Sequence, residues 1–161
     1  MNPSARPTPQ LRRATAEDAS SIAACVNEAY APWVARIGRR PWPMLQDYAA
    51  VVQQEQVTVA EADGQIVGVL VLSSTSSGLL IENVAVARAW QGQGIGHTLL
   101  LHAEHEARRL GQETIYLYTN ELMMENIALY ARIGYVEYER RQEQDFRRVF
   151  MRKSLSKEHD A

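Results

Sequence analysis

The sequence predicts a single α/β (α+β) domain in which strands and amphipathic helices alternate along the chain. Runs rich in apolar and β-branched residues are separated by segments whose apolar residues recur at helical spacing, in the order β-α-α-β-β-β-α-β-α-β-β. The length of 161 residues and the 46% content of hydrophobic residues suit one domain that buries its own core.

The N-terminal elements follow from proline and capping signals. Residues 1–10 contain three prolines and predict a disordered leader, and residues 11–14 predict a short strand. Thr15 is a candidate N-cap for the first helix, because its hydroxyl can accept a hydrogen bond from a free backbone N–H. That helix is expected to end at about Tyr30, because Pro32 lacks the N–H that a helix interior requires.

An irregular stretch is expected over residues 31–43, where prolines and a glycine interrupt any regular pattern. Residues 44–53 return to helical spacing. Residues 57–61 and 65–73 are typical of strands and flank an Asp-Gly turn, which predicts a β-hairpin.

The C-terminal half supplies the remaining elements. They are a strand over residues 79–86, a helix from Ile95 to Leu110, a strand over residues 114–119, a short helix that Gly134 closes, and a hairpin of strands over residues 135–142 and 147–153. The domain therefore spans residues 11–155, and residues 156–161 form a tail.

A glycine-rich loop between the strand over residues 79–86 and the next helix is the strongest functional signal. It reads Gln91-Gly92-Gln93-Gly94-Ile95-Gly96-His97. Backbone N–H groups at a helix N-terminus have no partner within the helix, and glycine lets a ligand approach them closely. Together with the helix dipole they favour an anion, and phosphate is the usual occupant. The loop therefore predicts a phosphorylated cofactor.

Two common phosphate-binding motifs do not fit this loop. A dinucleotide fingerprint needs a third glycine where His97 stands. A P-loop needs a lysine after its last glycine, whereas His97 follows Gly96. A mononucleotide site of a different class stays open as an alternative.

Two segments resemble the signatures of the GNAT superfamily of N-acetyltransferases. Gln91-x-x-Gly94-x-Gly96 resembles its pyrophosphate-binding motif. Asn126-Ile127-Ala128-Leu129-Tyr130-Ala131-Arg132-Ile133-Gly134-Tyr135 resembles its later signature in a slightly compressed form. The resemblance covers residues 11–155 and implies the GNAT fold, a mixed and mostly antiparallel central sheet flanked by helices. It also implies acetyl-coenzyme A (acetyl-CoA) as the co-substrate.

The resemblance further implies how the cofactor is held. In the superfamily the pantetheine arm pairs like an extra strand with the strand before the glycine loop, and the loop binds the pyrophosphate. The matching residues are Val84, Ala85 and Val86 for the pantetheine arm and the acetyl carbonyl, Gln91, Gly92, Gln93, Gly94, Ile95, Gly96 and His97 for the pyrophosphate, and Asn126 for the pantetheine arm.

The resemblance also implies direct attack of an amine on the thioester in a ternary complex. Tyr130 matches the tyrosine that protonates the departing thiolate, and a phenol can donate near neutral pH because its reference pKa is about 10. Glu82 is the candidate general base, because it shares strand parity with Val84 and would lie near the acetyl site. Two alternatives stay open: Tyr130 only packs beneath the sheet, or Glu82 binds a substrate ammonium or a neighbouring arginine without moving a proton.

Aromatic and arginine side chains after the first helix predict the acceptor site. The candidates are Trp33, Arg36, Arg39 and, from the strand over residues 114–119, Tyr118. Because a guanidinium matches the geometry of a carboxylate, the arginines suggest an acceptor that carries an anion. The expected substrate is a primary amine of a small molecule or peptide. Alternatively, the tryptophans of this segment pack on the sheet edge, or the domain is a non-catalytic acyl-CoA sensor.

Composition argues against several other classes. The net charge of −2, and the acidic residues interspersed among the arginines of residues 140–148, argue against a nucleic-acid partner. No apolar run reaches transmembrane length and no signal peptide is recognised, so no membrane partner and a cytoplasmic location are expected. The single cysteine, Cys25, excludes an internal disulfide. No metal site is predicted, and the resemblance allows a homodimer.

Overall fold

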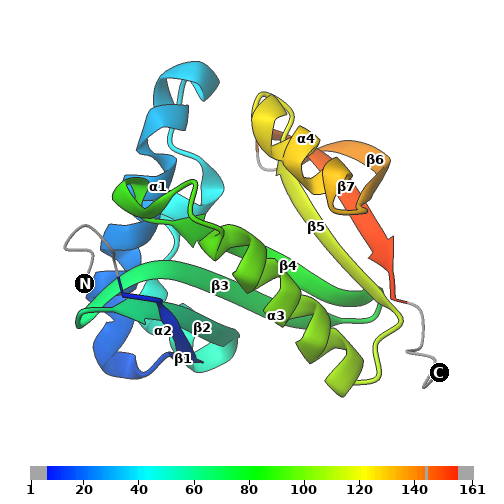
Figure 1. Ribbon diagram of the computed structural model, residues 1–161. Helices are drawn as coiled ribbons and strands as arrows, with labels where there is room; N and C mark the ends of the chain where they lie inside the picture. The colour runs from blue at the N-terminus through cyan, green and yellow to red at the C-terminus, as the bar shows by residue number, and fades with distance from the viewer. Residues whose placement is uncertain (1–6, 144, 156–161) are drawn as a thin grey trace.

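The computed structural model describes residues 7–143 and 145–155, so the first six residues of the expected leader and the expected tail lie outside the described residues. Within this part, seven strands form one sheet in the order β1-β2-β3-β4-β5-β7-β6 (Figure 1). The strands are β1 (Gln10–Arg13), β2 (Gln56–Ala62), β3 (Gln65–Thr75), β4 (Gly78–Val86), β5 (Thr114–Asn120), β6 (Val136–Glu143) and β7 (Phe146–Ser154). Among these strands only β4 and β5 pair in parallel, which confirms the mixed, mostly antiparallel sheet.

Four α-helices accompany this sheet in the described residues. They are α1 (Ala19–Ile37), α2 (Tyr48–Gln54), α3 (Ile95–Arg109) and α4 (Met124–Arg132). Figure 1 shows α3 crossing in front of β3 and β4. The crossing is close: a Cβ on Gly68 in β3 would lie 3.1 Å from side-chain atoms of both Ile95 and Leu99. A glycine in this strand therefore lets the start of α3, and the loop before it, lie directly on the sheet.

The parallel pair β4–β5 separates partway along its length. Residues 79–81 of β4 pair with residues 115–117 of β5, and no pairing of these strands continues beyond them. At the same point the register of β3 against β4 shifts, so that Glu82 has no partner between Ile81 and Asn83. A bulge of this kind bends and twists its strand. The bulge at Glu82 therefore coincides with the divergence of the two ribbons in Figure 1.

The expected end of the first helix at Tyr30 is wrong. Helix α1 continues through Pro32 to Ile37 and ends at Gly38, whose left-handed backbone donates to the carbonyl of Val34. Pro32 removes one hydrogen bond from the helix, but α1 continues past it. In the last turn, Arg36 pairs with Glu125 of α4 at 2.7 Å.

The start of the second helix also differs from expectation. A 3-10 turn, Trp42–Leu45, replaces the first part of the helix expected over residues 44–53, and α2 begins after Asp47. The Asp47 carboxylate accepts a hydrogen bond from the N–H of Ala49, which is an N-cap contact. Helix α4 begins at Met124, so Asn126 lies inside its first turn.

An ion cluster joins β1, β2 and the start of α1. The Arg12 guanidinium donates to Asp18 at 2.8 and 3.0 Å and to Glu61 at 2.8 and 3.2 Å. These hydrogen bonds stabilise the charged carboxylate and lower the pKa of Asp18 from 3.8 to about 2. The cluster therefore stabilises the fold only while Asp18 is ionised.

We expect Arg12→Gln to lower the free energy of unfolding by less than about 1 kcal/mol, because partial exposure screens the cluster. Since the folded pKa of Asp18 is depressed, its contribution is present above about pH 4 and is lost as pH falls towards 2. Denaturant unfolding should show the free energies of unfolding of the wild type and Arg12→Gln converging as pH falls over that range. A variant of the exposed neighbour, Arg13→Gln, should keep the wild-type pH dependence; equal losses in both variants would contradict the assignment.

Candidate active site

The last part of β4 presents backbone groups to the space between β4 and β5. The Tyr30 hydroxyl donates to the carbonyl oxygen of Val84 at 3.4 Å, and the Gln91 side-chain amide donates to that of Val86 at 3.0 Å. The N–H of Ala87 instead donates to β3 at 2.8 Å. Because the N–H and C=O of a strand residue point to one side and the side alternates, Val84 and Val86 direct both groups away from β3. Beyond Ile81 no strand of the described residues pairs with this edge, so an extended ligand can lie along it, where the only side-chain hydrogen bonds to the edge from the described residues are those of Tyr30 and Gln91.

The glycine loop follows β4 and begins α3. Gly92 and Gly94 have φ of 81° and 85°, a left-handed backbone that side-chain-bearing residues seldom adopt. The Gly94 carbonyl accepts the first helical hydrogen bond, from the N–H of Thr98 at 3.0 Å. The N–H groups of residues 95–97 therefore lie in the first helical turn, where the helix offers no acceptor. They suit an anion such as a pyrophosphate.

We call the cavity over this loop the donor cavity. It contains about 1210 Å³ of empty space, part of it open to solvent, between α1, β4, the loop, α3 and α4. The predicted cofactor residues that line it are Val84, Ala85, Val86, Gln91, Gly92, Gly94, Ile95, Gly96, His97 and Asn126. Gln93 is not among the lining residues. Trp33, predicted as an acceptor contact, lines this cavity instead.

Gly94→Ala should weaken the binding of acetyl-CoA, because a left-handed alanine strains the loop by roughly 1–2 kcal/mol and shifts its amides. The matched control is Gly111→Ala, since Gly111 follows the other end of α3 with φ of 73° and open space around it. Thermal unfolding should show similar losses of Tm for both variants. Only Gly94→Ala should reduce the additional rise in Tm on adding acetyl-CoA; an equal rise in both would contradict the assignment.

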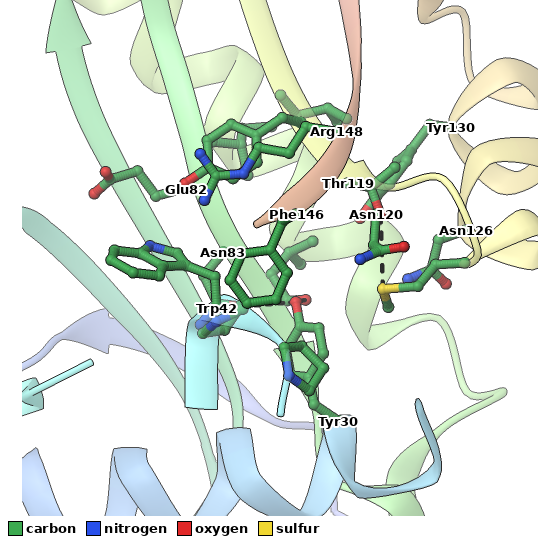
Figure 2. A pocket seen from close by; sticks show the side chains of 17 residues that line it. Tyr30, Trp42, Glu82, Asn83, Thr119, Asn120, Asn126, Tyr130, Phe146 and Arg148 are labelled. Carbon is green, nitrogen blue, oxygen red and sulfur yellow. Dashed lines mark hydrogen bonds between the residues drawn. The ribbon is translucent and has the colours of Figure 1, made fainter. Parts of the chain in front are cut away.

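A second cavity, the acceptor cavity, adjoins the donor cavity and contains about 580 Å³ of empty space, part of it open to solvent. Side chains from α1, β4, β5, β7 and α4 and from the segment before α2 line it (Figure 2). The two cavities share four lining residues, which are Tyr30, Val84, Asn126 and Tyr130. A group bound in one cavity can therefore meet a group bound in the other at this junction.

Tyr130 of α4 stands at the junction and is only 8% exposed. Burial raises its pKa to about 12, so the phenol keeps its proton throughout the neutral range. No side-chain hydrogen bond to the described residues engages its hydroxyl, whereas its ring packs edge-on against Tyr135 with centroids 6.1 Å apart. The ring is fixed by packing and the proton is left available.

A chain of hydrogen bonds supports the opposite wall of the acceptor cavity. Tyr30 donates to the Asn83 side-chain oxygen at 2.9 Å, and the Asn83 amide donates to the Tyr48 hydroxyl at 3.0 Å. Tyr48 donates in turn to the carbonyl of Pro43 at 2.6 Å. The chain links α1, β4 and α2 and fixes Tyr30 beside Val84. This placement agrees with a structural role for Asn83.

Glu82 lies at the other end of the acceptor cavity from Tyr130. In Figure 2 its carboxylate points away from Tyr130. Desolvation, together with the nearby charge of Glu55, raises the pKa of Glu82 above its ordinary value. No hydrogen bond or ion pair joins Glu82 to an arginine of the described residues.

The structure places the predicted acceptor residues at different sites. Tyr118 lines the acceptor cavity. Arg36 and Arg39 line neither cavity, because both bind protein groups outside them. Arg36 pairs with Glu125, and Arg39 donates to the carbonyl of Asp145 at 3.2 Å.

The arginine that does line the acceptor cavity is Arg148 of β7, which is not among the acceptor residues predicted from the sequence. Alternation along β7 was the available signal, since Phe146, Arg148 and Phe150 share one face of the strand. The charged residues on either side of Arg148 hid this alternation.

The described residues contain no group of three or more His, Cys, Asp or Glu side chains placed to hold a metal ion. No helix in this part of the chain is long and apolar enough to cross a membrane.

Comparisons with known proteins agree with this arrangement. The sequence matches the Acetyltransferase (GNAT) family over residues 22–135. It is 28% identical over 144 residues to the uncharacterized N-acetyltransferase YjgM of Escherichia coli. The aligned region covers 84% of this chain and 86% of YjgM.

Solved structures share the fold. A GCN5-related N-acetyltransferase from Rhodopseudomonas palustris has a TM-score of 0.78 at 23% identity and covers 94% of this chain and 98% of that one. A PaiA N-acetyltransferase from Thermoplasma acidophilum, solved in complex with coenzyme A, has a TM-score of 0.75 at 17% identity and covers 92% and 100% of the two chains. Because the family match spans most of the chain and includes β4, the glycine loop and Tyr130, this protein belongs to the acetyltransferase (GNAT) family.

Proposed function

We propose that the protein transfers an acetyl group from acetyl-CoA to a primary amine of a small molecule or peptide. The observation that carries the proposal is the meeting of two cavities at Tyr30, Val84, Asn126 and Tyr130. One cavity has the open strand edge and the free amides that a long phosphorylated cofactor needs. The other is smaller and is lined by aromatic and polar side chains, as suits an acceptor.

The residues of the donor cavity fit acetyl-CoA. The left-handed glycines bring backbone amides to its surface, and the open edge of β4 offers the alternating N–H and C=O groups that the amides of pantetheine can pair with. The complex of the PaiA protein with coenzyme A supports the same ligand class on this fold.

The cofactor supplies an acetyl group activated as a thioester, and the chain's own residues handle charge and protons. The N–H of Val84 donates to the carbonyl oxygen as negative charge builds there. A bond forms from the amine nitrogen to the carbonyl carbon while the carbon–sulfur bond breaks. Tyr130 gives its proton to the sulfur and regains one from solvent, and Glu82 takes the proton lost by the amine through water.

The first test is thermal unfolding with acetyl-CoA, ATP or NAD, followed by thiol release with a panel of amines. We expect acetyl-CoA alone to raise Tm, because a ligand that binds only the native state stabilises it. Thiol release that depends on an amine would support the enzyme. Binding of acetyl-CoA without turnover on any amine would favour a sensor, and a rise in Tm with ATP alone would overturn the proposal.

A further inference from the structure

The guanidinium of Arg148 lies in the wall of the acceptor cavity without a hydrogen bond to any of the described residues. Its side chain is 9% exposed, and its Nη2 atom is buried and unpartnered. Glu143 forms a long ion pair with Arg148, at 3.8 Å from Nη1, without a hydrogen bond, and it leaves Nη2 unpartnered. Buried polar groups are nearly always paired, so this group needs an explanation.

Aromatic rings hold the guanidinium in place. Its central carbon lies 4.3 Å from the centre of the Tyr118 ring, 5.7 Å from that of Trp42 and 6.0 Å from that of Phe146. Stacking of this kind fixes the plane of an arginine and leaves its edge donors free for a planar anion. In Figure 2 the side chain extends from β7 toward β4, over the cavity.

We propose that Arg148 binds the carboxylate of the acceptor, so that the substrate is a small aminocarboxylate with its amine toward Tyr130 and its carboxylate against this arginine. The inference rests on the proposed acetyl transfer. A carboxylate offers two acceptor oxygens in the plane that a guanidinium fork matches, and would supply the partner that Nη2 lacks.

The other charges of the cavity are compatible with this substrate. Glu82 directs its carboxylate away from the junction, and Glu143 also lies 3.6 Å from Arg141. Arg148 is therefore the cation on the cavity wall among the described residues. An acceptor with a second ammonium in place of the carboxylate would face this cation, and like charges in a poorly solvated site repel strongly.

The test compares amines that differ only in the carboxylate. The series runs from glycine to 6-aminohexanoate with phenylalanine and tryptophan added, each beside its carboxamide, and putrescine represents the polyamines. We expect kcat/KM for thiol release to favour at least one acid over its carboxamide by roughly 10- to 100-fold, the range for losing a hydrogen bond to a charged group. In Arg148→Met this preference should disappear.

Stability gives a second readout that does not need turnover. Methionine fills much of the same space without a charge, so Arg148→Met should match or exceed the wild-type Tm. The best acid should raise the Tm of the wild type in the presence of coenzyme A and should not raise that of Arg148→Met. The matched control is Arg147→Gln, because Arg147 is exposed and pairs with Glu121 outside the cavity.

Each outcome decides the question. The inference is supported if the acids are preferred over their carboxamides by the wild type and by Arg147→Gln, and if only Arg148→Met loses this preference. Carboxamides or putrescine acetylated as well as the acids by the wild type would overturn it while leaving the acetyltransferase proposal intact. Failure of acetyl-CoA to bind, with no thiol release from any amine, would overturn both. A lower Tm in Arg148→Met with an unchanged acid preference would make Arg148 a packing residue and overturn the inference alone.

Discussion

Tyr130→Phe should reduce kcat by roughly a hundredfold or more while leaving the binding of acetyl-CoA within about twofold. The hydroxyl lies at the junction of the two cavities and has no partner among the described residues, so its removal leaves the surrounding packing in place. Positioned proton donors contribute about 10²- to 10⁴-fold to rate. Because burial raises the pKa of Tyr130 to about 12, the phenol stays protonated, and its deprotonation should cause no loss of activity between neutral pH and pH 9.

Tyr135→Phe is the matched control for this prediction. Tyr135 packs against Tyr130, and its hydroxyl is buried without a hydrogen-bond partner, so its loss removes an unsatisfied group away from the junction. We expect Tyr135→Phe to keep wild-type kcat and to be at least as stable as the wild type. Equal falls in kcat for both variants would indicate that Tyr130 acts only by packing.

The leaving group separates proton donation from other roles of Tyr130. A thioester whose thiol has a low pKa departs readily as the thiolate and needs no proton. With an acetyl thioester of a nitrothiophenol, the difference between wild type and Tyr130→Phe should therefore shrink to a few fold. A difference that stays as large as with acetyl-CoA would show that Tyr130 orients the substrates rather than supplying the proton.

Local sequence signals predicted the donor side of the site well. The strand over residues 79–86, the glycine loop and the start of α3 at Ile95 all depend on residues close together in the chain, and the structure has them at the expected places. The resemblance to the later GNAT signature put Tyr130 and Asn126 in one short segment, and the structure has both on α4, which begins two residues before Asn126. These features need little knowledge of the rest of the molecule.

The acceptor side depends on contacts between distant segments, which the sequence does not reveal. Arg148 reaches the cavity because β7 pairs with β5, which sets Arg148 opposite Asn120. Helix α1 continues past Pro32, and Arg36 in its last turn pairs with Glu125, a residue 89 positions further along the chain. The bulge at Glu82 is a property of the register between β3 and β4 rather than of either strand alone.

Glu82→Gln should lower kcat/KM at neutral pH by about a hundredfold and remove the acidic limb of the pH–rate profile. In the wild type that limb should lie above the ordinary glutamate value, because desolvation and Glu55 raise the pKa of Glu82. If Glu82 instead holds a substrate ammonium, KM for the amine should rise while kcat and the limb change little.

The matched control for the pH–rate profile is Glu55→Gln, which removes the nearby negative charge and keeps the proposed base. Loss of that charge should lower the pKa of Glu82 and shift the acidic limb to lower pH, with little change in the maximal rate. If the acidic limb stays at the same pH in Glu55→Gln, or if it survives in Glu82→Gln, the limb reports the titration of a group other than Glu82.

Stability should move in the opposite direction to activity in Glu82→Gln. A carboxyl group whose folded pKa is raised favours the folded state in its protonated form, so the wild type loses this contribution as pH rises from the ordinary glutamate value through the raised one. Glutamine carries no such charge. The variant should therefore match the wild type below about pH 4 and exceed its free energy of unfolding at pH 7, measured by denaturant unfolding. A variant that is less stable at pH 7 would mean that the Glu82 carboxylate has a stabilising partner, and that its charge is kept for the fold rather than for proton transfer.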